Sequence, residues 1–131
     1  MSNARFVVVT TTISKRPAAA KLAGEIVASR LAACVQIWPI ASVYRWKGRV
    51  ETGNEYALVC KTRAAVAARL QEFIRSRHAY EVPEIIVSPI MSGLPSYLGW
   101  IAQETTPARQ PPLTFPRSAT KKAASRKGRK A

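Results

Sequence analysis

The sequence predicts an α+β fold: a four-stranded antiparallel sheet, two main helices on one of its faces, and an extra C-terminal helix. Three observations support this. Four short segments rich in β-branched and aromatic residues are typical of strands, two longer segments repeat apolar residues at helical spacing, and the segments follow the order β-α-β-β-α-β. This order is the ferredoxin-like pattern, in which both main helices pack on the same side of the sheet.

The first two elements are expected to be a strand over residues 5–12 and a helix that runs to about Ala33. The strand segment, RFVVVTTT, is short and β-branched, as buried strands commonly are. Ser14 is expected to cap the helix, and Pro17 is tolerated in its first turn. The apolar stripe of this helix comprises Leu22, Ala23, Ile26, Val27, Leu31 and Cys34.

A β-hairpin is expected to follow. Residues 34–48 read as its first strand, and Pro39 places that strand at an edge or a bulge because a central strand does not accept proline. Gly48 and Gly53 are expected to flank the turn, and residues 54–62 to form the returning strand.

The second half begins with a helix that Thr62 is expected to cap and that ends near His78. Pro83 stops any continuation, and residues 84–90 form the fourth strand. A short helix then covers about 95–104. The side chains expected to be buried by this last helix are Leu94, Leu98, Trp100 and Ile101.

The strands carry apolar residues on both faces. Tyr56, Leu58 and Cys60 alternate with Ala57 and Val59, so both sides of the sheet are expected to be buried. Two helices cover only one side, and self-association is the simplest way to cover the other. The aromatic residues expected to pack at such subunit contacts are Trp38, Tyr44, Trp46, Tyr97 and Trp100.

The positive charge is unevenly distributed, which divides the chain into a domain over residues 1–106 and a tail over 107–131. The tail holds eight of the 21 Lys and Arg residues and no acidic residue. It is rich in proline and alanine and lacks a hydrophobic period, so it is expected to be disordered. Two interpretations remain open: the tail contacts nucleic acid or anionic surfaces through phosphate groups, or it is a solubilising extension.

The composition excludes several classes of protein. No apolar run is long enough for a transmembrane helix, and Cys34 and Cys60 lack the spacing of a zinc site or a disulfide framework, which favours a cytoplasmic location. The chain contains no aspartate, no phosphate-binding loop and no nucleophile-elbow motif. The chain is therefore expected not to be an enzyme.

Several separated segments resemble the CutA divalent-cation-tolerance family. They are LAACVQIWPIASVYRWKG, ETGNEYALVCKT, HAYEVPEIIVSPI and SYLGW, and the resemblance runs from about Val7 to Ile101. The resemblance implies a ferredoxin-like subunit in a homotrimer similar to the PII signalling proteins, and a link to tolerance of divalent metals, copper above all. Residues 107–131 lie outside it.

The resemblance also implies metal ligands at His78 and Cys34. In copper-binding relatives a cysteine stands at the position of Thr11 and a second histidine at that of Arg77, so this chain retains a weaker ligand set. Taken without the family, His78 also fits a helix-terminal residue that satisfies a carbonyl, and Cys34 a small apolar filler. Any copper or other divalent metal is accordingly expected to bind weakly, with no obligatory cofactor.

A second candidate set comprises Glu55, Lys61, Tyr80 and Glu84. Glu55 and Lys61 share one face of a strand but lie roughly 20 Å apart, so they cannot pair within a subunit. The set fits ion pairs that fix the register of an oligomer, or an inter-subunit pocket for small ligands.

Three functional hypotheses follow. The first is a metal-responsive or small-ligand-binding trimer without catalysis. The alternative is a structural or signalling trimer that displays basic tails to nucleic acid, membrane or acidic proteins, with avidity from three linked tails. The third, an enzyme, would use His78, Lys61 and Glu84 in a trimer cleft.

Overall fold

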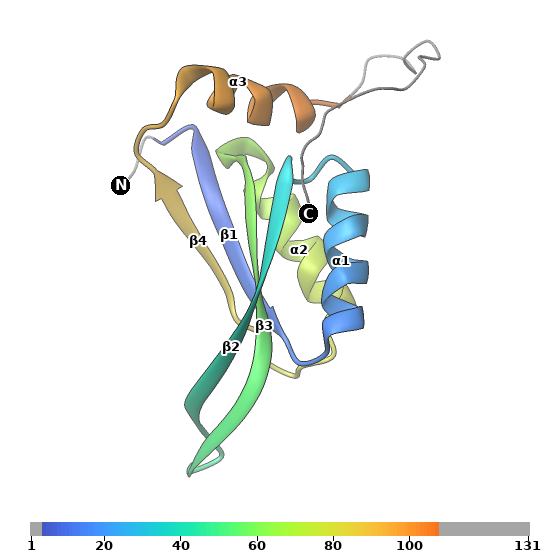
Figure 1. Cartoon of the computed structure of the whole chain (residues 1–131), viewed down its shortest axis with the longest axis vertical. Coiled ribbons are helices and arrows are strands. Elements are labelled where there is room, and N and C mark those ends of the chain that lie inside the picture. The colour runs from blue at the N-terminus through green and yellow to red at the C-terminus, as the bar shows by residue number, and fades with distance from the viewer. Residues whose placement is uncertain (1–3, 108–131) are drawn as a thin grey trace.

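A computed structural model describes residues 4–107 (Figure 1). Its elements are β1 (Phe6–Ile13), α1 (Arg16–Ala28), β2 (Cys34–Trp46), β3 (Arg49–Arg63), a 3₁₀ turn (Ala64–Val66), α2 (Ala67–Arg77), β4 (Ile85–Ile90) and α3 (Pro95–Glu104). The four strands form one antiparallel sheet in the order β2-β3-β1-β4. The predicted ferredoxin-like α+β fold with an additional C-terminal helix is confirmed. The predicted basic tail lies outside the described residues, except for Pro107.

The core lies between the sheet and the two main helices, which cover one face (Figure 1). Periodic apolar positions from α1 and α2 are inserted against alternate residues of the central strands. The fully buried members include Val9, Leu58, Ile26, Leu70 and Ile74. Burying such side chains is the main source of stability, at about 1.5–3 kcal/mol each. Among residues 4–107, no helix is long and apolar enough to cross a membrane.

Helix α1 ends at Ala28, so the prediction that it continues to about Ala33 is wrong. Arg30 adopts the left-handed conformation (φ 60°), which reverses the chain. Its N–H donates to the carbonyl of Val27 (3.0 Å), and that of Leu31 donates to Ile26 (3.1 Å). This pair of hydrogen bonds is the Schellman motif, which glycine usually supplies. An arginine at this position carries no sequence signal for a helix end.

Both predicted helix caps are also wrong. Lys15 precedes α1 and makes no side-chain capping hydrogen bond, while Ser14 is exposed. Thr62 lies within β3, paired with Val7 of β1, because the strand continues to Arg63 before the 3₁₀ turn begins. The threonine is therefore a strand residue with its side chain in the core.

The β2–β3 hairpin turns at Lys47 and Gly48, and both have positive φ (51° and 79°). Two such residues form the two-residue type I′ turn that matches the twist of the strands. The returning strand therefore starts at Arg49, earlier than predicted, and Gly53 lies within it opposite Ser42. Pro39 lies in β2, an edge strand, as predicted.

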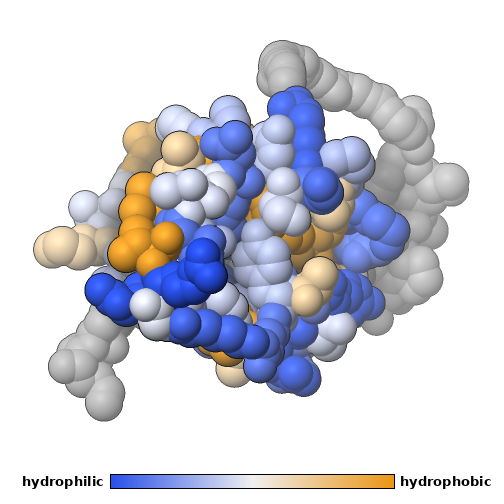
Figure 2. All heavy atoms as spheres, turned by 90° about the horizontal axis from the view of Figure 1, so that it is seen from below, coloured by the Kyte–Doolittle hydropathy of each residue, from blue (hydrophilic) through white to orange (hydrophobic). Residues whose placement is uncertain are grey.

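The hairpin extends beyond the body of the molecule and exposes apolar side chains (Figures 1 and 2). Val43 is 72% exposed and Val50 is 66% exposed. Viewed from the hairpin end, apolar side chains form a patch beside strongly hydrophilic ones (Figure 2). On the sheet face opposite α1 and α2, the larger exposed side chains are Trp38, Tyr44, Trp46 and Ile86.

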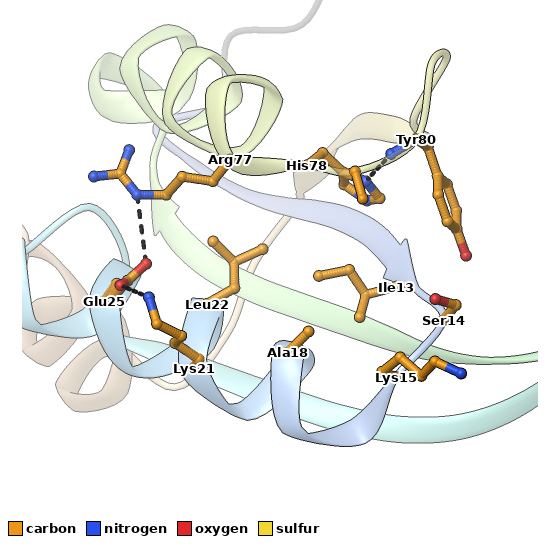
Figure 3. Close-up of a pocket in the computed structure, with 11 residues that line it drawn as sticks. Ile13, Ser14, Lys15, Ala18, Lys21, Leu22, Glu25, Arg77, His78 and Tyr80 are labelled. Carbon is orange, nitrogen blue, oxygen red and sulfur yellow. Dashed lines mark hydrogen bonds and ion pairs between the residues drawn. The ribbon is translucent and has the colours of Figure 1, made fainter.

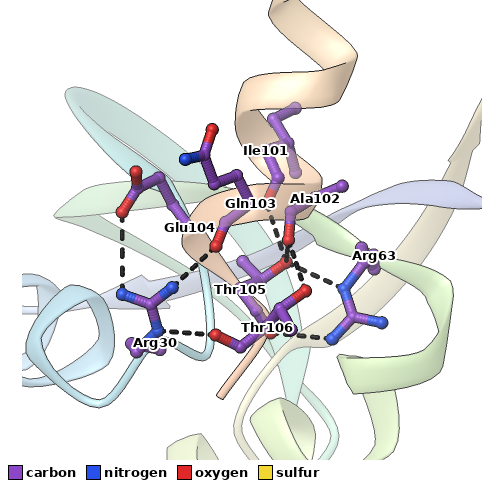
Figure 4. Close-up of polar contacts among 8 residues, drawn as sticks. All are labelled: Arg30, Arg63, Ile101, Ala102, Gln103, Glu104, Thr105 and Thr106. Carbon is purple, nitrogen blue, oxygen red and sulfur yellow. Dashed lines mark hydrogen bonds and ion pairs between the residues drawn. The ribbon is translucent and has the colours of Figure 1, made fainter. Parts of the chain in front are cut away.

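Two arginines hold the C-terminal end of α3 (Figure 4). Arg30 donates from Nε to the carbonyl of Thr106 (2.8 Å) and from Nη2 to that of Gln103 (2.6 Å). Arg63 donates to the hydroxyl (3.0 Å) and carbonyl (2.7 Å) of Thr105. These charged donors satisfy carbonyls that a helix end leaves unpaired.

The burial predicted for α3 is only partly right. Ile101 is fully buried and Leu98 is half-buried, but Leu94 is 69% exposed and Trp100 is 39% exposed. The arginine contacts place one face of the short helix on the sheet, and the first turn remains at the surface. The apolar residues that remain exposed are available for a further contact.

Thr11→Val is expected to raise the free energy of unfolding by about 1 kcal/mol. Thr11 is 0% exposed, and its hydroxyl has no hydrogen-bond partner among the described residues. Valine keeps the shape and removes the desolvated hydroxyl. Urea unfolding measures the change, with Thr10→Val, at a half-buried position of the same strand, as the control. Destabilisation by Thr11→Val would contradict the expectation.

Candidate functional site

A groove of about 1060 Å³ lies at the base of the hairpin, where the end of β1 and the segment 80–84 meet β2 and β3. Three members of the predicted pocket, Glu55, Tyr80 and Glu84, line it together. The fourth, Lys61, does not line it. The other lining residues are Thr12, Ser14, Ala41, Ser42, Val43, Tyr44, Trp46, Gly53, Asn54, Glu81, Val82 and Pro83.

Glu55 and Tyr80 form a hydrogen-bonded pair within this groove. The Tyr80 hydroxyl donates to Glu55 Oε1 at 2.8 Å. Burial by itself raises the pKa of Glu55, but hydrogen bonds from Ser42, Tyr80 and Thr12 outweigh it, and the net pKa lies below the ordinary value. Burial, and then the hydrogen bond to Glu55, raises the pKa of Tyr80 to about 12. At neutral pH the pair is therefore a carboxylate held by a neutral phenol.

Lys61 lies elsewhere, toward the opposite end of the sheet. It is paired with Cys34 in the β2–β3 register, and its Nζ donates to Gln36 Oε1 at 2.6 Å. Glu55 and Lys61 share one face of β3 without making a pair, as the sequence spacing indicated. The proposed inter-subunit role of Lys61 stays a prediction.

His78 follows the last turn of α2, and both nitrogens of its ring are engaged. Its Nδ1 accepts from the backbone N–H of Tyr80 (3.2 Å), so Nε2 carries the proton and donates to the carbonyl of Thr12 (2.6 Å). The ring thus connects the end of α2 to β1. A metal ion could bind to either nitrogen only by replacing one of these hydrogen bonds.

The other predicted metal-site residues do not surround His78. Through the strand pairing with Lys61, Cys34 lies at the same height along the sheet as Val8 of β1. His78 instead hydrogen-bonds to Thr12, farther along β1. Four residues of strand separate these levels, roughly 13 Å. Within residues 4–107 no three His, Cys, Asp or Glu side chains are grouped to hold a metal ion. Metal binding by His78 and Cys34 stays a prediction.

Thr11 and Arg77, which replace family ligands, have structural surroundings of their own. Thr11 faces the core and is inaccessible to solvent. The Arg77 guanidinium stacks on Phe73 at 3.7 Å and lies 3.4 Å from the Glu25 carboxylate. Neither side chain provides a copper ligand.

The polar groove residues that the prediction missed include Ser42, Tyr44 and Glu81. The positions of Ser42 and Tyr44 could not be predicted because the turn was expected between Gly48 and Gly53. In the structure the turn is at Lys47 and Gly48, so both residues pair with the returning strand. Glu81 had a usable signal, since it stands three positions before Glu84 on the same short connection. Together Glu55, Glu81 and Glu84 give the groove three carboxylates in a strongly basic chain.

Glu55→Gln is expected to destabilise the protein at neutral pH by about 1 kcal/mol, because a charged acceptor is replaced by a neutral one. The pKa of Glu55 is lower in the folded state than in the unfolded state, where it is near 4.5. The ionised carboxylate therefore adds to the free energy of unfolding above pH 4.5, and this stabilisation is lost as the pH falls through the folded-state pKa. The two proteins should therefore converge in stability below pH 4.5. Denaturant unfolding across pH measures this.

A double-mutant cycle with Tyr80→Phe separates the hydrogen bond from general charge effects. In the Tyr80→Phe background, Glu55→Gln should cost less at neutral pH, since the donor at 2.8 Å is gone. Additive effects of the two substitutions would contradict the pairing.

The sheet order, the two helices on one face and the groove beside a long hairpin define a ferredoxin-like α+β domain. Residues 7–104 match the family described as CutA1 divalent ion tolerance protein. The chain therefore belongs to the CutA family.

Relatives and solved structures agree with this assignment. The chain is 44% identical over 100 residues to "Protein CutA, chloroplastic" of Arabidopsis thaliana, covering 76% of this chain and 55% of that protein. It is 39% identical over 99 residues to the "Divalent-cation tolerance protein CutA" of Thermus thermophilus, covering 75% and 96%. The crystal structure of CutA1 from Oryza sativa superposes with a TM-score of 0.76 at 40% identity, covering 80% and 97%. The chain thus spans about half the length of the plant relative.

Proposed function

We propose that this chain forms a homotrimer that binds divalent cations, copper among them, or small ligands, and that it acts without catalysis. The names of its relatives, which refer to divalent-cation tolerance, support the metal link. A cytoplasmic location is part of the proposal, in keeping with two free cysteines in the described part of the chain.

The observation that carries the proposal is the acidic groove at the base of the hairpin. Three carboxylates, Glu55, Glu81 and Glu84, line it, although the chain carries 21 Lys and Arg against seven acidic residues. Carboxylate oxygens are ligands that divalent cations accept, and their charge raises the local concentration of cations. We therefore assign cation binding to this groove, where three of the seven acidic residues lie together.

The groove also lies beside the surface expected to meet another subunit. Tyr44 and Trp46 line it and belong to the exposed hairpin. We place the remaining ligands on a second subunit, because the described part of one chain groups no three metal-ligating side chains. The proposal therefore requires the oligomer, and metal binding should be lost when the oligomer is dissociated.

Calorimetric titration of the reduced, full-length protein with copper(II) tests the proposal. Glu81→Gln combined with Glu84→Gln is expected to weaken binding about tenfold or more, while Glu72→Gln, an exposed carboxylate on α2, leaves it unchanged. His78→Ala distinguishes the two ligand sets. Loss in His78→Ala alone would place the ion at the histidine, and absence of saturable binding to wild type would refute the metal proposal.

A second candidate function is a trimer that displays basic tails to nucleic acid. It is supported by the eight Lys and Arg and the absence of acidic residues in 107–131. DNA binding that falls steeply with salt and disappears when 107–131 is deleted is the expected result. Equal binding by the deleted protein would refute it.

A further inference from the structure

A second hollow, of about 320 Å³, lies between α1 and the segment 77–80 (Figure 3). It is on the helical side of the molecule and differs in character from the acidic groove. Figure 3 shows the side chains of Ala18, Leu22 and Ile13 directed into it from α1 and the end of β1. The inner wall is thus apolar, with Ile13 and Leu22 almost fully buried (8% and 4% exposed).

The rim of the hollow is cationic. Lys15 lies just before α1, Lys21 in its second turn and Arg77 at the end of α2, and all three line the hollow (Figure 3). Glu25 is its only carboxylate among the described residues. Three cations against one anion leave an excess of two positive charges around a small apolar cavity.

Glu25 neutralises only part of this rim. Its carboxylate lies 2.5 Å from Lys21 Nζ and 3.4 Å from Arg77 Nε, so one anion is shared by two cations. The hydrogen bond from Lys21 lowers the pKa of Glu25, which keeps it ionised at neutral pH. Lys15 makes no ion pair or hydrogen bond with another described side chain.

Arg77 is held in a fixed orientation at the edge of the hollow, with its guanidinium beside Glu25 (Figure 3). Its guanidinium stacks on Phe73 at 3.7 Å, and its Nε faces Glu25. Nη1 donates to Ser76 (3.3 Å), while Nη2 has no acceptor among the described residues. A guanidinium fixed in this way loses little conformational entropy when it binds a further anion.

We propose that this hollow binds a small organic anion: one phosphate or carboxylate group attached to a compact apolar body. The cations of the rim hold the charged group, and the wall of Ile13, Ala18 and Leu22 accepts the apolar part. The volume is near the lower end of the roughly 300–1,000 Å³ of small-molecule sites, which excludes bulky ligands. The site adjoins the acidic groove, because Ser14 and Tyr80 line both, but it requires no metal ion.

The test uses the full-length protein and phenyl phosphate as probe, with inorganic phosphate and phenol as its two halves. Calorimetry measures affinity, and ¹³C-methyl NMR of Ile13 and Leu22 locates the probe. Phenyl phosphate is expected to bind more tightly than either half and to shift both methyl signals. Inorganic phosphate binding equally well, or shifts confined to other residues, would overturn the proposal.

Two matched pairs of variants test the rim and the wall separately. Lys15→Ala should weaken phenyl phosphate about two- to fivefold, whereas Arg69→Ala, which removes the same charge from the exposed side of α2, should not. Ala18→Leu should fill the hollow and abolish the methyl shifts, whereas Ala20→Leu, an exposed position outside it, should preserve them. Equal effects within either pair would refute the site.

Discussion

Trp38→Glu is expected to dissociate the proposed homotrimer into monomers. Trp38 is 58% exposed on the sheet face opposite α1 and α2, where it lies next to Ala57 of the neighbouring strand. A large aromatic residue exposed on such a face is typical of a hot spot, and its removal costs at least about 2 kcal/mol per interface. Placing an unpaired carboxylate there adds the cost of its desolvation.

Light scattering coupled to gel filtration measures this result. The wild-type protein should show three times the 14.4 kDa chain mass, and Trp38→Glu should show a single chain. Val27→Glu is the control, because Val27 is also an exposed apolar residue (42%) but lies on α1. A wild-type monomer, or equal dissociation by Val27→Glu, would contradict the assignment of the interface.

Arg63→Met is expected to lower the free energy of unfolding by about 2–4 kcal/mol. Arg63 makes two hydrogen bonds to Thr105, which is 1% exposed, and so fixes the end of α3 on the sheet (Figure 4). Methionine retains much of the apolar contact but leaves the Thr105 carbonyl without its charged donor.

Thermal unfolding followed by circular dichroism measures this change, which should lower Tm by roughly 10 °C. Arg69→Met is the matched control, since Arg69 is exposed on α2 and makes no hydrogen bond or ion pair with the described residues of α3. A change below about 0.5 kcal/mol in Arg63→Met would show that α3 is held mainly by Ile101.

The fold was predictable because its signals are repeated over many residues. The apolar stripe of α2 and the β-branched run of β1 each involve several positions, so one misleading residue does not hide them. The predicted ends of the helices and strands were wrong where the backbone conformation of a single residue determines where an element ends. Arg30 ends α1 in a conformation usual for glycine, and Lys47 stands in a turn where asparagine is the common signal.

The candidate site was predictable only in part. Glu55, Tyr80 and Glu84 line one groove because the hairpin base lies next to the segment after α2. Lys61 does not line it, since six residues of strand carry it to the other end of the sheet. The residue type also does not reveal which hydrogen bonds a side chain makes in the folded protein. Both ring nitrogens of His78 are engaged in hydrogen bonds, which the sequence could not show.

Arg30 stabilises the ends of two helices: its backbone ends α1, and its side chain binds the carbonyls at the end of α3. These two roles favour different residue types. Glycine best tolerates the positive φ that terminates α1. The guanidinium of Arg30, however, donates two hydrogen bonds at once, to the carbonyls of Gln103 and Thr106, which are distant in sequence. Glycine would relax the backbone and release α3, and lysine would retain the charge without the fork of donors. Residue 30 therefore tolerates fewer replacements than an ordinary surface position.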